Sequence, residues 1–317
     1  MTNSLAFLFP GQGSQAVGMG KELAEKYPVA RQTFEEADVA LGMALSRLCF
    51  EGPEEELRRT EITQPSILAV SVATWRVLAE QGVKPAWVAG HSLGEYSAHV
   101  AAGTLNFADA VRTVRNRGRY MQEAVPANVG AMAAILGMEA GKVAQICVDA
   151  ARGEVCEPAN RNSPEQVVIS GHKGAVERAV ALATELGAKK ALLLPVSAPF
   201  HCSLMQPAQE RLAQDLNALQ LRNPDTPVMC NVDAAPAATA AASRDALIRQ
   251  VTGTVRWEEC VRGLIAKGVE TFVEVGPGKV LWGLMRQIDR SKTSWQTSDD
   301  AALQKALQGA AGLTSSS

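Results

Sequence analysis

The pentapeptide G-H-S-L-G at residues 90–94 restricts the fold of this chain more than any other stretch of its sequence. It lies between an apolar segment, residues 86–89, that predicts a buried strand, and a helical pattern that begins at Glu95. A serine at a sharp strand-to-helix turn exposes its hydroxyl, and the next backbone N–H points at whatever that hydroxyl attacks. The motif therefore predicts an α/β protein with Ser92 as nucleophile and Leu93 N–H in an oxyanion hole. A glycine turn with an inert serine is the alternative interpretation.

A serine nucleophile needs a general base, because its hydroxyl is a weak nucleophile at pH 7. His201 is the candidate, since it ends a proline-containing loop after an expected strand, where α/β active sites gather. His91, His99 and His172 are interpreted as structural residues. No aspartate or glutamate between Ser92 and His201 ends an expected strand, so we expect an amide or a backbone carbonyl to orient the imidazole.

One arginine has a position that demands a buried partner. The helix expected over residues 107–121 carries four arginines, and Arg117 lies at the edge of its apolar stripe whereas Arg112 and Arg119 point away. The partner of Arg117 is either an internal carboxylate or the carboxylate of a substrate. The residues alone leave both interpretations open.

The order of the expected elements indicates an α/β fold in two parts. Strands alternate with helices through residues 1–127, and the pattern resumes over residues 198–317, which predicts one large hydrolase-like domain with a parallel sheet. Residues 128–197 read as strand-helix-strand-helix-strand, the size of an inserted ferredoxin-like α+β subdomain. We expect a linker at 234–242 and a poorly ordered tail from about Ser291. The expected strands are 5–9, 86–89, 130–137, 166–171, 189–196, 227–232 and 271–275, and the expected helices include 30–48, 65–81, 95–103, 107–124, 139–151, 173–186, 203–218, 243–252 and 257–267.

Composition excludes several classes of protein. A net charge of −2 with no basic block argues against a nucleic-acid partner. The first apolar run, residues 5–9, is too short for a signal peptide or a membrane span, so we expect a cytoplasmic protein. The six cysteines form no C-x-x-C motif, which favours reduced thiols and no metal site. The loop at 10–15 matches half of a dinucleotide fingerprint but lacks the acidic ribose partner, so no nucleotide site is expected.

With these residues in place, the sequence resembles the malonyl-CoA:acyl carrier protein transacylases, the loading enzymes of bacterial type II fatty acid synthesis. The resemblance covers about residues 4–290. It is carried by FPGQGSQ at 9–15, Thr63-Gln64-Pro65, GHSLGEYSA at 90–98, Arg117, GAMAA at 130–134, Asn160 and Asn162, Phe200-His201, Arg249-Gln250 and EVGPGKVL at 274–281.

The resemblance implies a complete acyl-transfer site. Ser92 would be the acyl nucleophile and His201 its base, with the backbone carbonyl of Gln250 orienting the imidazole. The N–H groups of Gln12 and Leu93 would form the oxyanion hole. The expected reaction is ping-pong transfer of malonyl from malonyl-CoA to the pantetheine thiol of acyl carrier protein through a malonyl-serine intermediate.

The resemblance also implies how the substrate is held. Arg117 would bind the malonyl carboxylate bidentately, and Met121, Asn160 and Asn162 are further expected substrate-binding residues. Phe200, directly before the histidine, goes with malonyl in related domains, in preference to branched acyl groups. No cofactor is expected beyond the two thioester substrates, and the enzyme is expected to be a monomer.

The sequence departs from the family pattern at two positions. Arg161 replaces an expected apolar or aromatic residue, and Thr254 stands where proline is frequent. The first would alter contacts with the pantetheine arm or the carrier, and the second only a turn. Three rival functions remain: a serine thioesterase or hydrolase, the transacylase subunit of a malonate decarboxylase, and a non-catalytic scaffold that binds a carrier protein.

Overall fold

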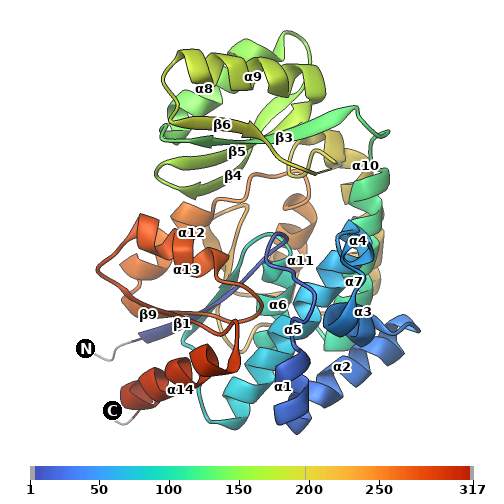
Figure 1. The fold of residues 1–317 in the computed structure, drawn as a ribbon, viewed down its shortest axis with the longest axis vertical. Coiled ribbons are helices and arrows are strands. Elements are labelled where there is room, and N and C mark those ends of the chain that lie inside the picture. Colours follow the sequence, from blue (N-terminus) through green and yellow to red (C-terminus); the bar gives the residue numbers. More distant parts are fainter. Residues whose placement is uncertain (1–3, 197, 315–317) are drawn as a thin grey trace.

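The computed structural model describes residues 4–196 and 198–314, and its α/β class confirms the expected fold class (Figure 1). The larger sheet has the strand order β10-β9-β1-β2-β7-β8, and every neighbouring pair is parallel except β7 and β8. Its strands are β1 Ser4–Phe9, β2 Trp87–Gly90, β7 Val228–Cys230, β8 Ala235–Ala237, β9 Val269–Glu274 and β10 Thr293–Gln296.

Helices cover both faces of this sheet, which explains why β1 is an uninterrupted apolar run. Phe7 and Phe9 pack into the core on one face of the sheet, whereas Ala6 and Leu8 pack into the core on the other face. The helices of this part are α1 Lys21–Lys26, α2 Pro28–Leu41, α3 Leu45–Glu51, α4 Glu54–Leu57, α5 Thr60–Glu80, α6 Gly94–Ala101, α7 Phe107–Glu123, the 3₁₀ turn η1 Ser203–Met205, α10 Gln206–Ala218, α11 Ala240–Arg249, α12 Trp257–Ala266, α13 Val280–Ile288 and α14 Asp300–Thr314. Of the helices described, none could serve as a membrane span.

A second, antiparallel sheet with the order β4-β5-β3-β6 lies at the top of Figure 1. Ala133 and Ile135 of β3 pack against its two helices, while Met132 belongs to the core of the large domain. The sheet is therefore apolar on both faces, and its lower face closes over the large domain. Its elements are β3 Gly130–Leu136, α8 Ala140–Ala151, β4 Cys156–Ser163, β5 Gln166–His172, α9 Lys173–Glu185 and β6 Lys190–Leu193.

This second sheet contains a strand that the sequence does not predict. β4 includes proline, two asparagines and an arginine, which are poor strand formers, so no apolar alternation marks it. It lies at the sheet edge, where proline is tolerated, and its register against β5 shifts twice. The prediction of three strands was therefore wrong, and the described order is β-α-β-β-α-β.

Two further segments expected to lack structure are ordered. The tail from Ser291 was expected to be poorly ordered, yet β10 pairs with β9 and α14 buries Leu303, Ala306 and Ala310. The short polar sequence of β10 has no apolar alternation that would predict a strand, because this segment becomes ordered only through pairing with the sheet. The linker at 234–242 contains β8 and the first turn of α11. The three terminal serines and Ser197 lie outside the described residues.

Helix boundaries also differ from expectation at two places. The single helix expected over 30–48 is divided into α2 and α3, because Gly42 adopts a left-handed φ of 62° that ends α2. The helix expected from residue 65 begins at Thr60 and includes Pro65. Neither difference concerns the loops of the site. These loops follow the carboxyl ends of β1, β2 and β7, which lie side by side.

Candidate active site

The turn between β2 and α6 holds Ser92 in an unusual backbone conformation. Its φ is 50°, in the left-handed region that non-glycine residues rarely adopt. A Cβ at Gly90 would lie 1.9 Å from the carbonyl carbon of Gly94, and a Cβ at Gly94 would lie 2.0 Å from the carbonyl oxygen of Phe9. The two glycines of the motif are therefore required by the close approach of the turn to itself and to β1.

His201 lies against this serine. Its Nε2 is 2.7 Å from Ser92 Oγ, and its Nδ1 is 2.9 Å from the backbone oxygen of Gln250. Because a carbonyl oxygen can only accept, the proton resides on Nδ1 and Nε2 accepts from the serine hydroxyl. His201 also has a left-handed φ, of 59°. The pair thus has the geometry of a nucleophile and its base, with a backbone carbonyl in the place of a triad acid.

The surroundings keep this imidazole neutral. Burial lowers the pKa of His201 to about 3, and the positive charge of Arg117 acts in the same direction. The ring is therefore unprotonated at pH 7 and free to accept the serine proton.

Arg117 is a buried cation with neutral partners. It is 2% exposed, and its NH1 donates to Gln64 Oε1 at 2.7 Å, while NH2 donates to Ser92 Oγ at 3.1 Å and to Gln250 Oε1 at 3.0 Å. Its guanidinium also lies 5.6 Å from the ring centroid of Tyr96. Within the described ranges no carboxylate forms an ion pair with it. Burial lowers the pKa of Arg117, but a guanidinium stays charged, so the site presents an unpaired cation beside the nucleophile.

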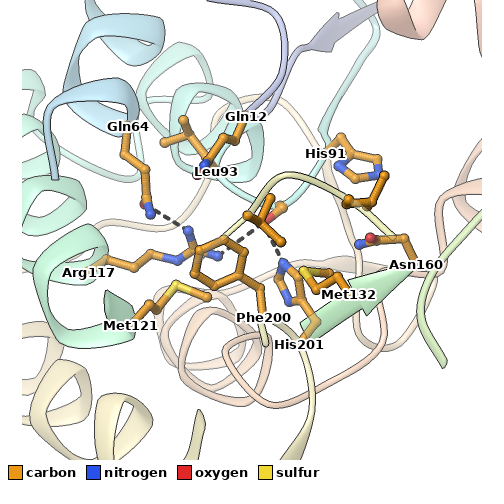
Figure 2. A pocket seen from close by; sticks show the side chains of 13 residues that line it. Gln12, Gln64, His91, Leu93, Arg117, Met121, Met132, Asn160, Phe200 and His201 are labelled. Carbon is orange, nitrogen blue, oxygen red and sulfur yellow. Dashed lines mark hydrogen bonds between the residues drawn. The ribbon is translucent and has the colours of Figure 1, made fainter. Parts of the chain in front are cut away.

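These residues line one pocket (Figure 2). Its wall is largely apolar, and Arg117, Ser92 and His201 supply its reactive surface. Such a wall strengthens the attraction between the guanidinium and an anion that enters. The lining residues are Gln12, Gln64, His91, Ser92, Leu93, Arg117, Met121, Met132, Asn160, Leu194, Val196, Phe200 and His201.

Two backbone N–H groups can reach a developing oxyanion. Gln12, in the loop after β1, and Leu93, in the turn after β2, both line the pocket. The N–H of Ser92 is already used, because it donates to Asn231 Oδ1 at 2.7 Å. Neither Gln12 N nor Leu93 N has a hydrogen-bond partner within residues 4–196 and 198–314. Both N–H groups are therefore available to a ligand.

The structure brings most of the expected substrate-binding residues to this pocket, with one difference. Met121, Asn160 and Phe200 line it, but Asn162 does not. Asn162 Oδ1 instead lies 2.8 Å from Nε2 of His91, whose ring lines the pocket. From the sequence, His91 was expected to be a structural residue, and its place at the pocket was not predicted.

Two polar residues that contact Arg117 or the nucleophile turn were given no role from the sequence, as were the apolar wall residues Met132, Leu194 and Val196. Gln64 accepts from Arg117, and its only sequence signal is the Thr63-Gln64-Pro65 motif. Asn231 bonds the nucleophile turn but has no local motif, because it reaches that turn through the pairing of β7 with β2.

The side chains at the two departures from the family pattern have their hydrogen-bond partners outside the pocket. Arg161 NH1 donates to Glu259 of α12 at 3.1 Å, and Thr254 Oγ1 donates to the backbone oxygen of Pro158 at 2.7 Å. Both contacts join β4 to the large domain. Neither Arg161 nor Thr254 lines the pocket.

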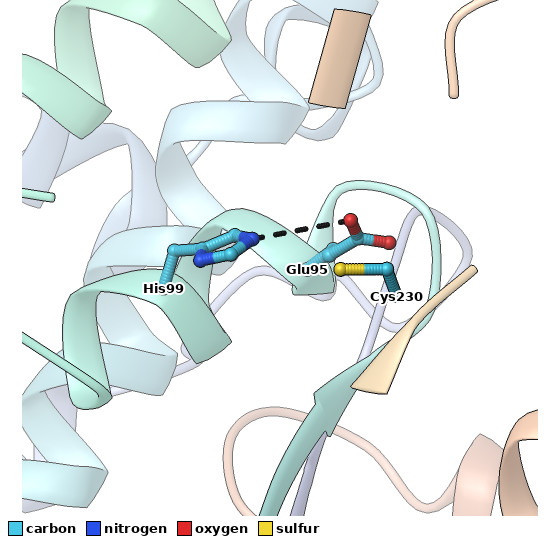
Figure 3. A group of neighbouring side chains, drawn as sticks. All are labelled: Glu95, His99 and Cys230. Carbon is cyan, nitrogen blue, oxygen red and sulfur yellow. Dashed lines mark ion pairs between the residues drawn. The ribbon is translucent and has the colours of Figure 1, made fainter. Parts of the chain in front are cut away.

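The fold also gathers three potential metal ligands below the pocket. Glu95 and His99 of α6 and Cys230 of β7 are buried, and one ligand atom of each lies within 4.8 Å of the others (Figure 3). The expectation of no metal site rested on the absence of a short metal-binding motif such as C-x-x-C. Glu95, His99 and Cys230 do not form such a motif, because they come from two separate elements. Metal analysis of the protein tests that expectation directly.

Comparisons with known proteins show the family of the chain. The family model described as the acyl transferase domain matches residues 6–306. The malonyl CoA-acyl carrier protein transacylase of Salmonella typhimurium is 53% identical over 303 residues, covering 95% of this chain and 98% of that protein. The Bacillus subtilis (strain 168) protein of the same name is 50% identical over 307 residues, covering 96% and 97%.

Solved structures of the same kind superimpose closely. The transacylase of Coxiella burnetii has a TM-score of 0.95 at 45% identity, covering 97% of this chain and 98% of that one. A malonyl-transacylase solved in complex with a type II PKS acyl-carrier protein has a TM-score of 0.94 at 48% identity, covering 96% and 99%.

Proposed function

Because the chain belongs to the malonyl-CoA:acyl carrier protein transacylase family of acyltransferases, we propose the role that each residue of its site has in that reaction. The enzyme transfers malonyl from malonyl-CoA to the pantetheine thiol of acyl carrier protein. The observation that carries the residue assignment is the unpaired guanidinium of Arg117 at 3.1 Å from the hydroxyl of Ser92. A cation at that distance from a nucleophile suits an acyl group that ends in a carboxylate.

Acylation begins when Ser92 Oγ attacks the thioester carbonyl of malonyl-CoA and its proton passes to His201 Nε2. The carbonyl oxygen becomes an oxyanion and accepts hydrogen bonds from Gln12 N–H and Leu93 N–H. When the C–S bond breaks, the sulfur of CoA leaves with the proton from His201. The carbonyl of Gln250 stabilises the imidazolium that exists between these proton transfers, because it accepts from Nδ1–H.

The second half-reaction reverses these steps with a different thiol. His201 takes the proton of the pantetheine thiol, whose sulfur attacks the malonyl ester, and Ser92 leaves with the proton. Exchange of one thioester for another is nearly thermoneutral, so the enzyme needs a covalent intermediate and protection from water. Met121, Met132 and Phe200 provide apolar walls around that ester.

Arg117 anchors the malonyl carboxylate in both half-reactions. Its NH2 donates to a neutral acceptor, Ser92 Oγ, and a carboxylate can take that place with a stronger charge-assisted bond. Gln64 holds the other terminal nitrogen and so keeps the guanidinium plane in place.

The test is the mass of the intact protein after incubation with malonyl-CoA in the absence of carrier. We expect a malonyl adduct that is absent in Ser92→Ala and that disappears when holo acyl carrier protein is added. Free malonate without an adduct would indicate a hydrolase. An adduct that acyl carrier protein does not discharge would favour the malonate decarboxylase subunit, and no reaction at all would favour a scaffold.

We further propose a cytoplasmic, monomeric enzyme that needs no metal or cofactor. All six cysteines are buried free thiols, which is usual for proteins of a reducing compartment. The pocket already holds a nucleophile, a base and a cation, so thioester exchange needs no further group. Light scattering of the purified protein tests the monomer, and elemental analysis tests the absence of metal.

A further inference from the structure

A buried polar scaffold lies directly beneath the nucleophile turn, and its first member is Asn231. This residue follows β7 and is fully buried. Its Oδ1 accepts from Ser92 N at 2.7 Å, and its Nδ2 donates to the backbone oxygen of Gly90 at 2.7 Å. At the point where the chain turns from β2 toward α6, the amide of Asn231 thus provides the backbone hydrogen bonds that a neighbouring strand would otherwise provide.

The second member is the side chain of Gln250. Its Nε2 donates to the backbone oxygen of Ser92 at 3.0 Å, and its Oε1 accepts from Arg117. Its own backbone oxygen accepts from His201. Gln250 therefore touches the nucleophile, the base and the cation at once.

A single carboxylate oxygen joins these two amides. Oε2 of Glu95 accepts from the backbone N of Asn231 at 2.8 Å and from Gln250 Nε2 at 3.0 Å. Glu95 is fully buried in the first turn of α6, where the helix dipole favours an acidic side chain. Its other oxygen lies 4.0 Å from His99 Nε2, with Cys230 also beside it (Figure 3).

We propose that Glu95 is a positioning residue that sets the orientation of Gln250 and thereby of Arg117, so that it governs discrimination between acyl groups. Without this Oε2, Gln250 Nε2 keeps Ser92 O at 3.0 Å and Asn231 Oδ1 at 3.5 Å as acceptors, so the amide is held less firmly and its Oε1 shifts relative to the guanidinium. Asn231 has a different part in the scaffold: it holds the left-handed backbone of Ser92, which neighbours must stabilise. The inference rests on the proposed function, because it assigns roles within that same site.

The chemistry separates the two roles. Arg117 meets the carboxylate of a malonyl group but nothing comparable on an acetyl group, so a displaced guanidinium slows malonyl transfer more than acetyl transfer. A displaced Ser92 penalises both. The ratio of acylation rates from malonyl-CoA and acetyl-CoA therefore reports on the contact between Glu95 and Gln250, and it is insensitive to the fraction of protein that is folded.

The experiment compares Glu95→Leu with Glu95→Gln by rapid quench and intact-protein mass. The leucine removes the acceptor, and we expect the malonyl-to-acetyl ratio to fall by about tenfold or more, the effect of one hydrogen bond to a charged group. The glutamine can place its amide oxygen where Oε2 lies, so we expect its ratio to stay within about twofold of wild type. If Glu95→Leu does not fold, Glu95→Asp shortens the side chain away from Gln250 and is expected to lower the ratio as well.

Two further variants complete the test. Asn231→Ala is expected to slow acylation from both thioesters by a similar factor. Glu274→Leu removes another buried glutamate, one that accepts from Leu281 N and Trp282 N and does not line the pocket, and is expected to lower the unfolding temperature with the ratio unchanged.

An unchanged ratio in Glu95→Leu, or an equal fall in Glu274→Leu, overturns the inference. If the wild-type protein itself forms no malonyl adduct, the proposed function fails instead, so the two failures are distinguishable.

Discussion

Replacement of Arg117 by alanine is the most informative single perturbation of this site. The guanidinium is 2% exposed and lacks an ion pair within the described residues, so a bound malonyl carboxylate would be the first carboxylate in direct contact with it. Hydrogen bonds to charged groups contribute about 1.5–3 kcal/mol each. Two such bonds give about 3–6 kcal/mol, which corresponds to a fall of roughly 10²- to 10⁴-fold in kcat/KM for malonyl-CoA.

Acetyl-CoA provides the internal comparison. Its acyl group has no carboxylate, so the same substitution should change its acylation rate by less than about tenfold, mainly through the loss of the contact with Ser92 Oγ. Acylation of each protein by each thioester is followed by rapid quench and intact mass. Arg112→Ala is the matched control, because Arg112 lies on the same helix with an exposed side chain that bonds Ala40 O and Asp109.

One result would refute this reasoning. If both thioesters lose the same factor in Arg117→Ala, the arginine only supports the fold of the pocket, and the carboxylate clamp is wrong. An effect of similar size in Arg112→Ala would have the same meaning.

Three further predictions concern the base, the turn and the ion pair between β4 and α12. His201 should remain neutral from pH 8 to pH 5, because its pKa is lowered to about 3, and a ring ¹⁵N shift that titrates near pH 6.5 would contradict this. Gly94→Ala should cost several kcal/mol of unfolding free energy, at or above the usual ~1–3 kcal/mol of overpacking, whereas Gly141→Ala, with open space at its Cβ, should be neutral or stabilising in thermal unfolding. Arg161→Ala should cost at most about 1 kcal/mol, because its ion pair with Glu259 is partly exposed, and should leave the KM for acyl carrier protein unchanged; a raised KM would place Arg161 at the carrier.

The stability profile follows from the same pKa shifts. The unfolded chain binds a proton at His201 near pH 6.5 while the folded chain binds it only near pH 3, so this residue stabilises the fold above pH 6.5 and less as the pH falls. Burial raises the pKa of Glu95 and of Glu274 to about 7, so these carboxyls contribute most below their unfolded pKa and lose that contribution as the pH rises through 7.

Much of the fold follows from local sequence patterns. β1 and β2 are apolar runs that end at glycine-containing turns, and α7 has one apolar stripe, so their lengths and faces can be predicted. β4 and β10 could not be predicted, because their polar sequences become strands only through pairing with β5 and β9. The division of residues 30–48 at Gly42 depended on one left-handed glycine within an otherwise helical pattern.

The sequence by itself determined which single positions are candidates for the chemistry of the site. Ser92 stands in a turn motif that only glycines on both sides allow, and His201 and Arg117 were identifiable from the loop and the helix stripe that carry them. These signals are local, since they depend on the conformation of a few neighbouring residues.

Only the tertiary structure decided which groups satisfy one another. Asn231 reaches Ser92 because β7 pairs with β2, and Gln250 meets Arg117 because the loop after α11 packs beneath the nucleophile turn. The sequence left open whether the partner of Arg117 is an internal carboxylate. The structure gives the guanidinium neutral partners from three separate elements. The partner of a buried polar group is set by strand order and packing between distant segments, and no short-range pattern encodes it.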